Sequence, residues 1–359
     1  MPDKHTPPNT ASPPCIWLLS AYRSASHAAW ADWLVDSFKH IRWQRLELPG
    51  RHFRWRIRGN PLSWLDQLPE ETPTLILATS MVDLATLKGL HPRLAAVPAI
   101  YYFHENQFAY PVGEQQHDSV DPQMVQLYGA LAADQLLFNS SFNRDSFFNG
   151  IDELLQKLPD QTPHNLLPRL EAKSAILPVP IRSLANANAH KNPQLVVWNH
   201  RWEYDKNPQL FADALLQLKK KDQPFQLALL GERANRKPAA LSQIEQHLAS
   251  HIVFNGKASQ QEYQHYLQQA AIVVSTAIHE FQGLAILEAV SAGAVPLVPD
   301  DLCYREQYPP MFRYPPQDSQ ALADKLLQML QQAPAAPDVS AWFEKNLMDY
   351  WTQYLTPAD

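Results

Sequence analysis

Two glutamates eight residues apart, Glu280 and Glu288, form the clearest chemical pattern in the sequence. They lie in residues 275–293 (STAIHEFQGLAILEAVSAG), which predict a strand, a loop and a helix over 281–292 that ends at Gly293. Eight helical residues span about 12 Å, so one carboxylate can bind a sugar hydroxyl while the other binds the ribose of the same nucleotide sugar. A glutamate near the helix cap and a second, solvated glutamate are the structural alternative.

The start of this predicted helix is a candidate phosphate site. Its first N–H groups lie at the positive end of the helix dipole, where an anion is stabilised. The residues expected to bind the donor here are Phe281, Gln282, Gly283 and Leu284, between the two glutamates.

A second candidate pattern, WNHRWEYDKNP at 198–208, follows a predicted strand. Arg201 and Lys206 leave the same strand end, so both can reach one diphosphate and neutralise a departing nucleoside diphosphate. A surface ion-pair cluster with neighbouring acids is the alternative. Gly231 and Glu232 end the next strand of this half, where the backbone can approach a nucleotide.

The ten glycines exclude two common phosphate-binding motifs. The closest pair is nine residues apart. A dinucleotide fingerprint needs glycines two and three apart, and a P-loop needs a pair five apart, so neither can be present. The two cysteines provide no disulfide framework, and the polar, proline-rich residues 1–14 predict a disordered tail and no signal peptide.

A basic, aromatic segment stands out in a chain whose net charge is −6. Residues 39–58 contain seven basic residues and one acid, and 51–58 read RHFRWRIR. Arginines interleaved with aromatic rings suit phosphates and exposed bases. As a strand, the segment would place its arginines on one face; an edge strand with solvated arginines is the alternative. The candidates are Arg51, Arg54, Trp55, Arg56 and Arg58.

These patterns are set in two series of alternating strands and helices, which predict parallel sheets covered on both faces. Strand ends in the first half carry further polar candidates: His104, Glu105, Asn106, Gln107 and Asn139. His104 can bind an acceptor hydroxyl or a donor sugar, and a purely structural histidine is the alternative. We expect a first domain over 15–185, a linker over 186–193, a second domain over 194–338 and a helix in 339–359 that packs back toward the first domain. A ligand is expected between two such units.

The second half resembles nucleotide-sugar glycosyltransferases of the glycosyltransferase-B fold, family 4-like. The resemblance implies that Glu280 and Glu288 contact the donor sugar and ribose, and that Arg201 and Lys206 bind the diphosphate. It also implies two Rossmann-like domains facing a cleft, and retention of configuration by a front-side route in which the leaving phosphate helps to deprotonate the acceptor. With His104 positioning the hexose, the expected catalytic residues are His104, Glu280, Arg201 and Lys206.

The first half is similar to the N-terminal domain of the tRNA-queuosine α-mannosyltransferase family. The similarity is carried by LLSAYRSASHAAW, LPGRHFRWRIRGNPLSW, YYFHENQFAYPV and AADQLLFNSSFNRDSF. It implies transfer of mannose from GDP-mannose to the cyclopentenediol of queuosine in tRNA(Asp), with acceptor contacts at Ser26 and His27. Where the family tends to have two glycines before Ser-His, this chain has Ser24 and Ala25, so a loop that needs positive φ is in question.

The chain has no Asp-x-Asp motif, which other glycosyltransferases use to hold a divalent metal, so we expect no metal and no cofactor besides the donor substrate. A cytoplasmic monomer that does not bind membranes is expected. Two alternatives stay open: a family 4-like transferase acting on a lipid, glycan or small metabolite, and a non-catalytic protein that binds nucleotide sugar or tRNA.

Overall fold

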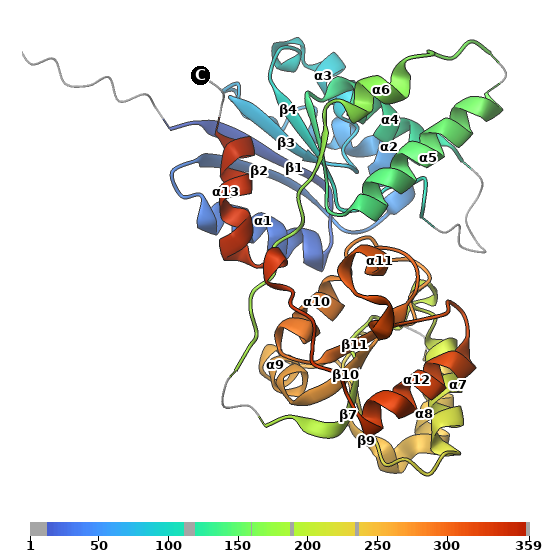
Figure 1. Ribbon diagram of the computed structural model, residues 1–359. Coiled ribbons are helices and arrows are strands. Elements are labelled where there is room, and N and C mark those ends of the chain that lie inside the picture. The colour runs from blue at the N-terminus through green and yellow to red at the C-terminus, as the bar shows by residue number, and fades with distance from the viewer. Residues whose placement is uncertain (1–12, 111–118, 159, 187–189, 234–236, 357–359) are drawn as a thin grey trace, which may run out of the picture.

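The computed structural model describes residues 13–110, 119–158, 160–186, 190–233 and 237–356, which form two parallel β-sheets covered by helices (Figure 1). Residues 1–12 of the predicted tail lie outside the described residues. The strands of the first sheet are β1 (Cys15–Arg23), β2 (Arg42–Pro49), β3 (Leu75–Thr79), β4 (Ala99–Phe103), β5 (Gln135–Phe138) and β6 (Ser174–Ile176). Its helices are α1 (Ala25–Ser37), α2 (Phe53–Trp64), α3 (Leu84–Leu90), α4 (Asp121–Ala132), α5 (Ser141–Lys157) and α6 (Leu166–Glu171). The predicted α/β architecture is confirmed.

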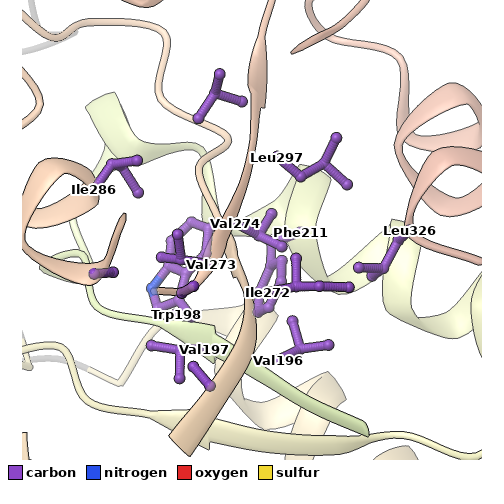
Figure 2. Packing of buried hydrophobic residues seen from close by; sticks show 14 of the residues in the cluster. Val196, Val197, Trp198, Phe211, Ile272, Val273, Val274, Ile286, Leu297 and Leu326 are labelled. Atoms are coloured by element: carbon purple, nitrogen blue, oxygen red, sulfur yellow. The ribbon is translucent and has the colours of Figure 1, made fainter. Parts of the chain in front are cut away.

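The second sheet repeats the alternation of strand and helix. Its strands are β7 (Asn192–Trp198), β8 (Gln226–Leu229), β9 (Ile252–Asn255), β10 (Ala270–Val274), β11 (Val295–Pro299) and β12 (Arg313–Tyr314). The helices that follow are α7 (Pro208–Lys219), α8 (Ala239–Leu248), α9 (Gln260–Gln269), α10 (Leu284–Ser291), α11 (Tyr304–Gln307), α12 (Ser319–Gln331) and α13 (Glu344–Leu355). Side chains from β7, β10, β11 and the helices on either face fill its core (Figure 2).

The order of the strands determines where ligands bind. The first sheet has the order β2-β1-β3-β4-β5-β6 and the second β12-β11-β10-β7-β8-β9. In the second sheet all strands are parallel, but the order in which they are added reverses between β7 and β10: β8 and β9 extend one side of β7, and β10, β11 and β12 extend the other. Ligands of open α/β sheets bind at such a reversal, outside the carboxyl ends of the strands. Both donor motifs predicted from sequence follow these two strands, and the fold therefore brings them together.

The last helix, α13, packs on the first domain although it follows the second in sequence (Figure 1). Leu347, Trp351 and Leu355 are buried in the same cluster as Trp30 and Tyr102 of the first domain. Hydrogen bonds between Ile181 and residues 342 and 344 join α13 to the segment that connects the domains. The two domains are thus linked by two crossings of the chain.

The segment 51–58 is not a strand, which corrects the sequence prediction. Residues 53–58 form the start of α2, and Arg51 and His52 precede it. Ile57, Asn60, Pro61 and Trp64 are buried at a spacing of three and four residues. This helical period decides the structure, because it places one face of the segment in the core, whereas the alternation of arginine and apolar residues covers fewer than two turns. Pro61 has no N–H with which to bond the Ile57 carbonyl one turn earlier. Asn60 Nδ2 donates to that carbonyl instead, at 3.2 Å.

Two further boundaries differ from the sequence prediction. The helix expected over 281–292 begins only at Leu284, because Gly283 has a positive φ of 67° and ends an irregular loop. A β-carbon at Gly283 would also lie 2.9 Å from Tyr304 Cε1. In addition, β7 begins at Asn192, within the predicted linker, of which residues 187–189 lie outside the described part.

Candidate active site

A buried lysine holds the two donor motifs together. Lys206 Nζ lies 3.0 Å from Glu280 Oε2 and 3.1 Å from Asp205 Oδ2, and it donates to the His279 carbonyl at 2.9 Å. The three side chains are 10%, 21% and 5% exposed for Lys206, Glu280 and Asp205. We call Asp205, Lys206 and Glu280 the donor cluster. It joins the loop after β7 to the loop after β10.

The electrostatics of the donor cluster favour its charged form. Burial opposes ionisation of Glu280, but the Lys206 ammonium holds the pKa of this carboxyl at about 2. Burial likewise opposes the charge on Lys206, but the two carboxylates raise its pKa. The neighbouring His200 and His279 are kept neutral, since burial lowers the pKa of each to about 4. At neutral pH the Lys206 ammonium and the Glu280 carboxylate are therefore both charged.

Glu288 lies on α10 and has its own partners. Tyr263 donates its hydroxyl to Glu288 Oε2 at 2.7 Å, and burial raises the pKa of this glutamate. Asn199 donates both to the Tyr263 oxygen (3.1 Å) and to the Ala285 carbonyl (2.7 Å). These contacts position Glu288 beside the first turn of α10. The first N–H groups of that turn are free of intrahelical partners, as at every helix start.

Arg201 is the exposed counterpart of Lys206. Its side chain is 55% exposed and lies 3.2 Å from Glu203, the surface pair that sequence left open as an alternative. Arg201 also acts electrostatically on Glu105 of the first domain: burial raises the pKa of Glu105 to about 7, and Arg201 opposes this rise. Arg201 is thus placed between the two domains.

The loops of the first domain meet this region. Tyr110 contacts His279 edge-on, with ring centroids 4.6 Å apart. His104 packs against His27 with centroids 4.1 Å apart, and burial lowers the pKa of both imidazoles, that of His27 to about 4. The structure therefore brings residues of both halves, predicted separately from sequence, to one place.

The residues 24–27 need no glycine. Ser24 is the N-cap of α1 with an extended backbone, and none of the residues 24–27 has a positive φ. The Ser24 hydroxyl lies 2.5 Å from His27 Nδ1 and 3.2 Å from the Ser26 hydroxyl. Here a serine cap, and not a positive-φ turn, starts the helix after β1.

Unpaired polar atoms mark this region. Within the described residues, buried atoms without a hydrogen-bond partner include His104 Nε2, His200 Nε2, His279 Nε2 and Asp205 Oδ1. The last three belong to residues that interact electrostatically with Lys206 or pair with it. Buried polar groups are almost always paired, so unpaired ones gathered in one region suit a polar ligand.

Several candidates hold the scaffold instead of facing a ligand. Asn106 is fully buried and its amide is used by Asn143, Ser146 and two backbone N–H groups. Asn139 is buried and bonds the His104 carbonyl and Asn143. Both amides are thus occupied by protein partners in this structure. Gln107 is partly buried, and its N–H donates to Gln126.

Four donor candidates likewise have other neighbours. Gln282 forms a pair of hydrogen bonds with the Val179 backbone (2.9 and 2.7 Å) and thus ties the donor loop to the interdomain segment. Position 231 requires glycine, because a β-carbon there would lie 1.6 Å from the His200 carbonyl oxygen. This close approach accounts for Gly231 without any contact to a nucleotide. Glu232 is exposed and pairs with Lys257 at 2.7 Å. Phe281, which lies before the helix, packs against His279 and Phe142.

The basic segment forms an exposed helical face. Trp55 is 55% exposed and lies over Gly59, where a β-carbon would come within 2.5 Å of the indole. Arg51, Arg54 and Arg58 are exposed around it. We call Arg51, Arg54, Trp55 and Arg58 the α2 surface. Arg56 is partly buried and donates to Ser63 (3.4 Å), and Arg58 pairs with Asp83 (2.9 Å).

Sequence reasoning missed Asp205 as a partner of Lys206 within the site, and also His200, Tyr263 and Asn199. Asp205 and His200 belong to the WNHRWEYDKNP motif. The position of this motif directly after a predicted strand could have identified them. Tyr263 lies on α9, far from the motifs in sequence, and no local pattern identifies it. Glu306 of α11 was also missed; it accepts hydrogen bonds from Ser141 and Phe142 at the start of α5.

Two further features are not found among the described residues. Among the described residues, no group of three or more histidine, cysteine or acidic side chains could hold a metal ion. In the same part of the chain, no helix combines the length and apolar composition that crossing a membrane requires.

Known protein families match the chain in two parts. Residues 15–181 match the model for the tRNA-queuosine alpha-mannosyltransferase N-terminal domain, and residues 182–341 match glycosyl transferases group 1. The curated tRNA-queuosine alpha-mannosyltransferase of Drosophila melanogaster is 33% identical over 326 residues, which are 87% of this chain and 86% of that protein.

Solved structures share the fold at low identity. Sucrose-phosphate synthase from Thermosynechococcus elongatus matches with a TM-score of 0.69 and 14% identity, over 95% of this chain and 98% of that one. Anabaena HepE in complex with UDP and glucose matches with a TM-score of 0.65 and 15% identity, over the same shares. Together with the two parallel sheets, these likenesses confirm the predicted glycosyltransferase-B fold.

Proposed function

The chain belongs to the tRNA-queuosine α-mannosyltransferase family, and from this premise we propose that it transfers mannose from GDP-mannose to the cyclopentenediol of queuosine in tRNA(Asp). One observation carries the proposal: the donor cluster lies where the strand order of the second sheet reverses, between β7 and β10, and loops of the first domain meet it there. A glycosyltransferase acting on another acceptor, or a non-catalytic binding protein, is not favoured by the family match.

In the proposed donor complex, the diphosphate lies between Arg201, Lys206 and the start of α10. The exposed guanidinium of Arg201 and the buried ammonium of Lys206 supply the positive charge, and the α10 dipole adds to it. Glu288, held by Tyr263, binds the ribose, and Glu280 binds a mannose hydroxyl. Gly283 positions both glutamates, because its N–H contacts Glu280 and its backbone starts α10.

The proposed reaction is a front-side displacement. The bond between the sugar C1 and the β-phosphate oxygen breaks while a bond from C1 to the acceptor oxygen forms on the same face. The acceptor proton passes to the departing phosphate oxygen, so that no protein carboxylate need act as nucleophile. Lys206 and Arg201 stabilise the charge that develops on the diphosphate. His104, whose Nε2 has no protein partner, positions the hexose or the acceptor hydroxyl.

The acceptor is proposed to contact the first domain. His27, Ser26 and Glu105 lie near His104 and Arg201, where the modified base would enter. The α2 surface offers arginines for phosphates and an exposed indole for a base. Because all of these groups come from one copy of the chain, we propose a monomer as the active form, working in the cytoplasm where its tRNA acceptor is found.

Metal independence is part of the proposal. Lys206 and Arg201 take the electrostatic role that a divalent metal has in other glycosyltransferases. Transfer should therefore proceed at an unchanged rate in EDTA. Activity that EDTA abolishes and Mn²⁺ restores would contradict this assignment.

The proposed function is tested by incubating the full chain with a panel of nucleotide sugars and with tRNA that contains or lacks queuosine. Nucleoside mass analysis should show a hexose added to queuosine with GDP-mannose, and no addition to tRNA without queuosine. Lack of a hexose shift on queuosine with every donor would overturn the acceptor assignment.

A further inference from the structure

Asp205 is the member of the donor cluster whose role the proposed reaction leaves unexplained. Its side chain is 5% exposed, and Oδ2 pairs with Lys206 whereas Oδ1 has no partner among the described residues. Its carbonyl accepts the Ile278 N–H at 2.9 Å. Thr276 donates its hydroxyl to the Lys206 carbonyl at 2.8 Å. The turn that carries Asp205 is thus fixed to the loop after β10.

The contacts of Lys206 are saturated before any donor binds. An ammonium has three donors. In this structure they reach Asp205, Glu280 and the His279 carbonyl, at 2.9 to 3.1 Å. A phosphate oxygen can be bound by Lys206 only if one of these acceptors is released. The backbone carbonyl is fixed, and Glu280 is four times as exposed as Asp205.

We infer that Asp205 is a positioning residue, which keeps the Lys206 ammonium in place when Glu280 leaves it for the donor sugar. This inference rests on the proposed function, in which Glu280 binds a mannose hydroxyl and Lys206 the diphosphate. Without the sugar, as with GDP alone, Glu280 stays on Lys206, the diphosphate is held by Arg201 and the start of α10, and Asp205 is not needed. With GDP-mannose, Asp205 is the remaining carboxylate that pairs with the buried ammonium.

The comparison of these two nucleotides provides the test. Calorimetric titration of the full chain, without tRNA, measures the Kd for GDP and for GDP-mannose. Asp205→Asn should raise the Kd for GDP-mannose about tenfold, the effect of one charge-assisted hydrogen bond, and leave the Kd for GDP within about twofold. Asp213→Asn on α7, whose carboxylate contacts Gln209, is the matched control and should change neither. Equal weakening of both nucleotides by Asp205→Asn would overturn the inference, since a merely structural role moves both.

The Glu280→Gln variant tests the same point without altering Asp205, and it decides the matter if Asp205→Asn does not fold. With Asp205 still on Lys206, it should bind GDP as the wild type does and GDP-mannose more weakly. Loss of GDP binding in this variant would show that Asp205 cannot hold Lys206, and would overturn the inference. Wild-type protein that binds neither nucleotide would instead contradict the proposed donor, and the inference with it.

Discussion

The donor cluster and the α2 surface carry charge in opposite ways. In the donor cluster one ammonium and two carboxylates are buried and paired with one another. On the α2 surface the arginines are exposed around an exposed indole. Buried charges interact strongly at short range and are little affected by salt, whereas exposed charges attract a polyanion from a distance and are screened. The first arrangement suits chemistry, and the second suits recognition of a large acceptor.

The largest effect expected from this contrast concerns Lys206. Lys206→Ala should lower kcat about 100-fold to 1,000-fold, because it removes positive charge from the leaving diphosphate. The KM for tRNA should stay within about twofold, since the α2 surface is intact. Steady-state kinetics with each substrate varied in turn measure both. Lys257→Ala, which removes an exposed lysine paired with Glu232, is the control. An equally large loss of kcat and of tRNA affinity would contradict the assignment of catalysis to the donor cluster and of tRNA binding to the α2 surface.

The next effect concerns stability at low pH. The folded pKa of Glu280 is about 2, below its unfolded value of about 4.5, so the unfolded state binds more protons as pH falls through this range. The folded His27, His200 and His279 have pKa values of about 4, below about 6.5 when unfolded. The free energy of unfolding should therefore fall first below pH 6.5, as these histidines resist protonation, and again below pH 4.5.

Urea unfolding between pH 7 and pH 3 separates the two stages. Glu280→Gln should reduce the loss of stability below pH 4.5, by at most about 3 kcal/mol, and keep the stage above it. Other carboxyls with lowered pKa values, such as Glu71 and Glu245, account for the loss that remains. Arg51→Gln on the α2 surface should leave both stages unchanged, because this exposed side chain lies outside the donor cluster. An unaltered slope below pH 4.5 in Glu280→Gln would mean that this carboxylate does not gain from its pairing with Lys206.

A smaller effect is expected at Trp55. Trp55→Ala should raise the KM for tRNA about tenfold by removing a stacking surface, and should leave kcat and the donor KM unchanged. Tyr350→Ala on α13 removes a similarly exposed ring and serves as control. Trp55→Ala kinetics that match those of the wild type would remove the α2 surface from acceptor binding.

The fold and the donor motifs could be predicted from sequence because parallel strands place their carboxyl ends at one edge. The strands before the donor motifs are recognisable in sequence as the apolar runs that are typical of buried parallel sheets. The donor residues follow these strands: Arg201, Lys206, Glu280 and Glu288. The pairing of Lys206 with Glu280 could not be predicted, since local sequence offers only neighbouring acids as partners. Proximity in the fold, across 74 residues of sequence, makes Glu280 the second partner of Lys206.

The α2 surface shows where local pattern fails. Arg54, Trp55, Arg56 and Ile57 alternate as in a strand, yet the buried Ile57, Asn60, Pro61 and Trp64 repeat as in a helix. Tertiary burial overrides a short alternation. Opposite charges also come from outside the segment: Glu71 pairs with Arg42, and Asp83 with Arg58, so the excess positive charge counted along the sequence is partly neutralised in space.

The salt dependence of the wild-type enzyme tests the contrast between the two regions most directly. The KM for queuosine-containing tRNA and the KM for GDP-mannose are measured between about 50 mM and 200 mM salt. The tRNA KM should rise about tenfold, as expected for about two phosphate contacts. The donor KM should change less than about threefold, because Arg201 is exposed but Lys206 and the start of α10, which also bind the diphosphate, are shielded from salt. A tRNA KM that is independent of salt, or two KM values that rise in parallel, would contradict the assignment of acceptor binding to the α2 surface and of donor chemistry to the donor cluster.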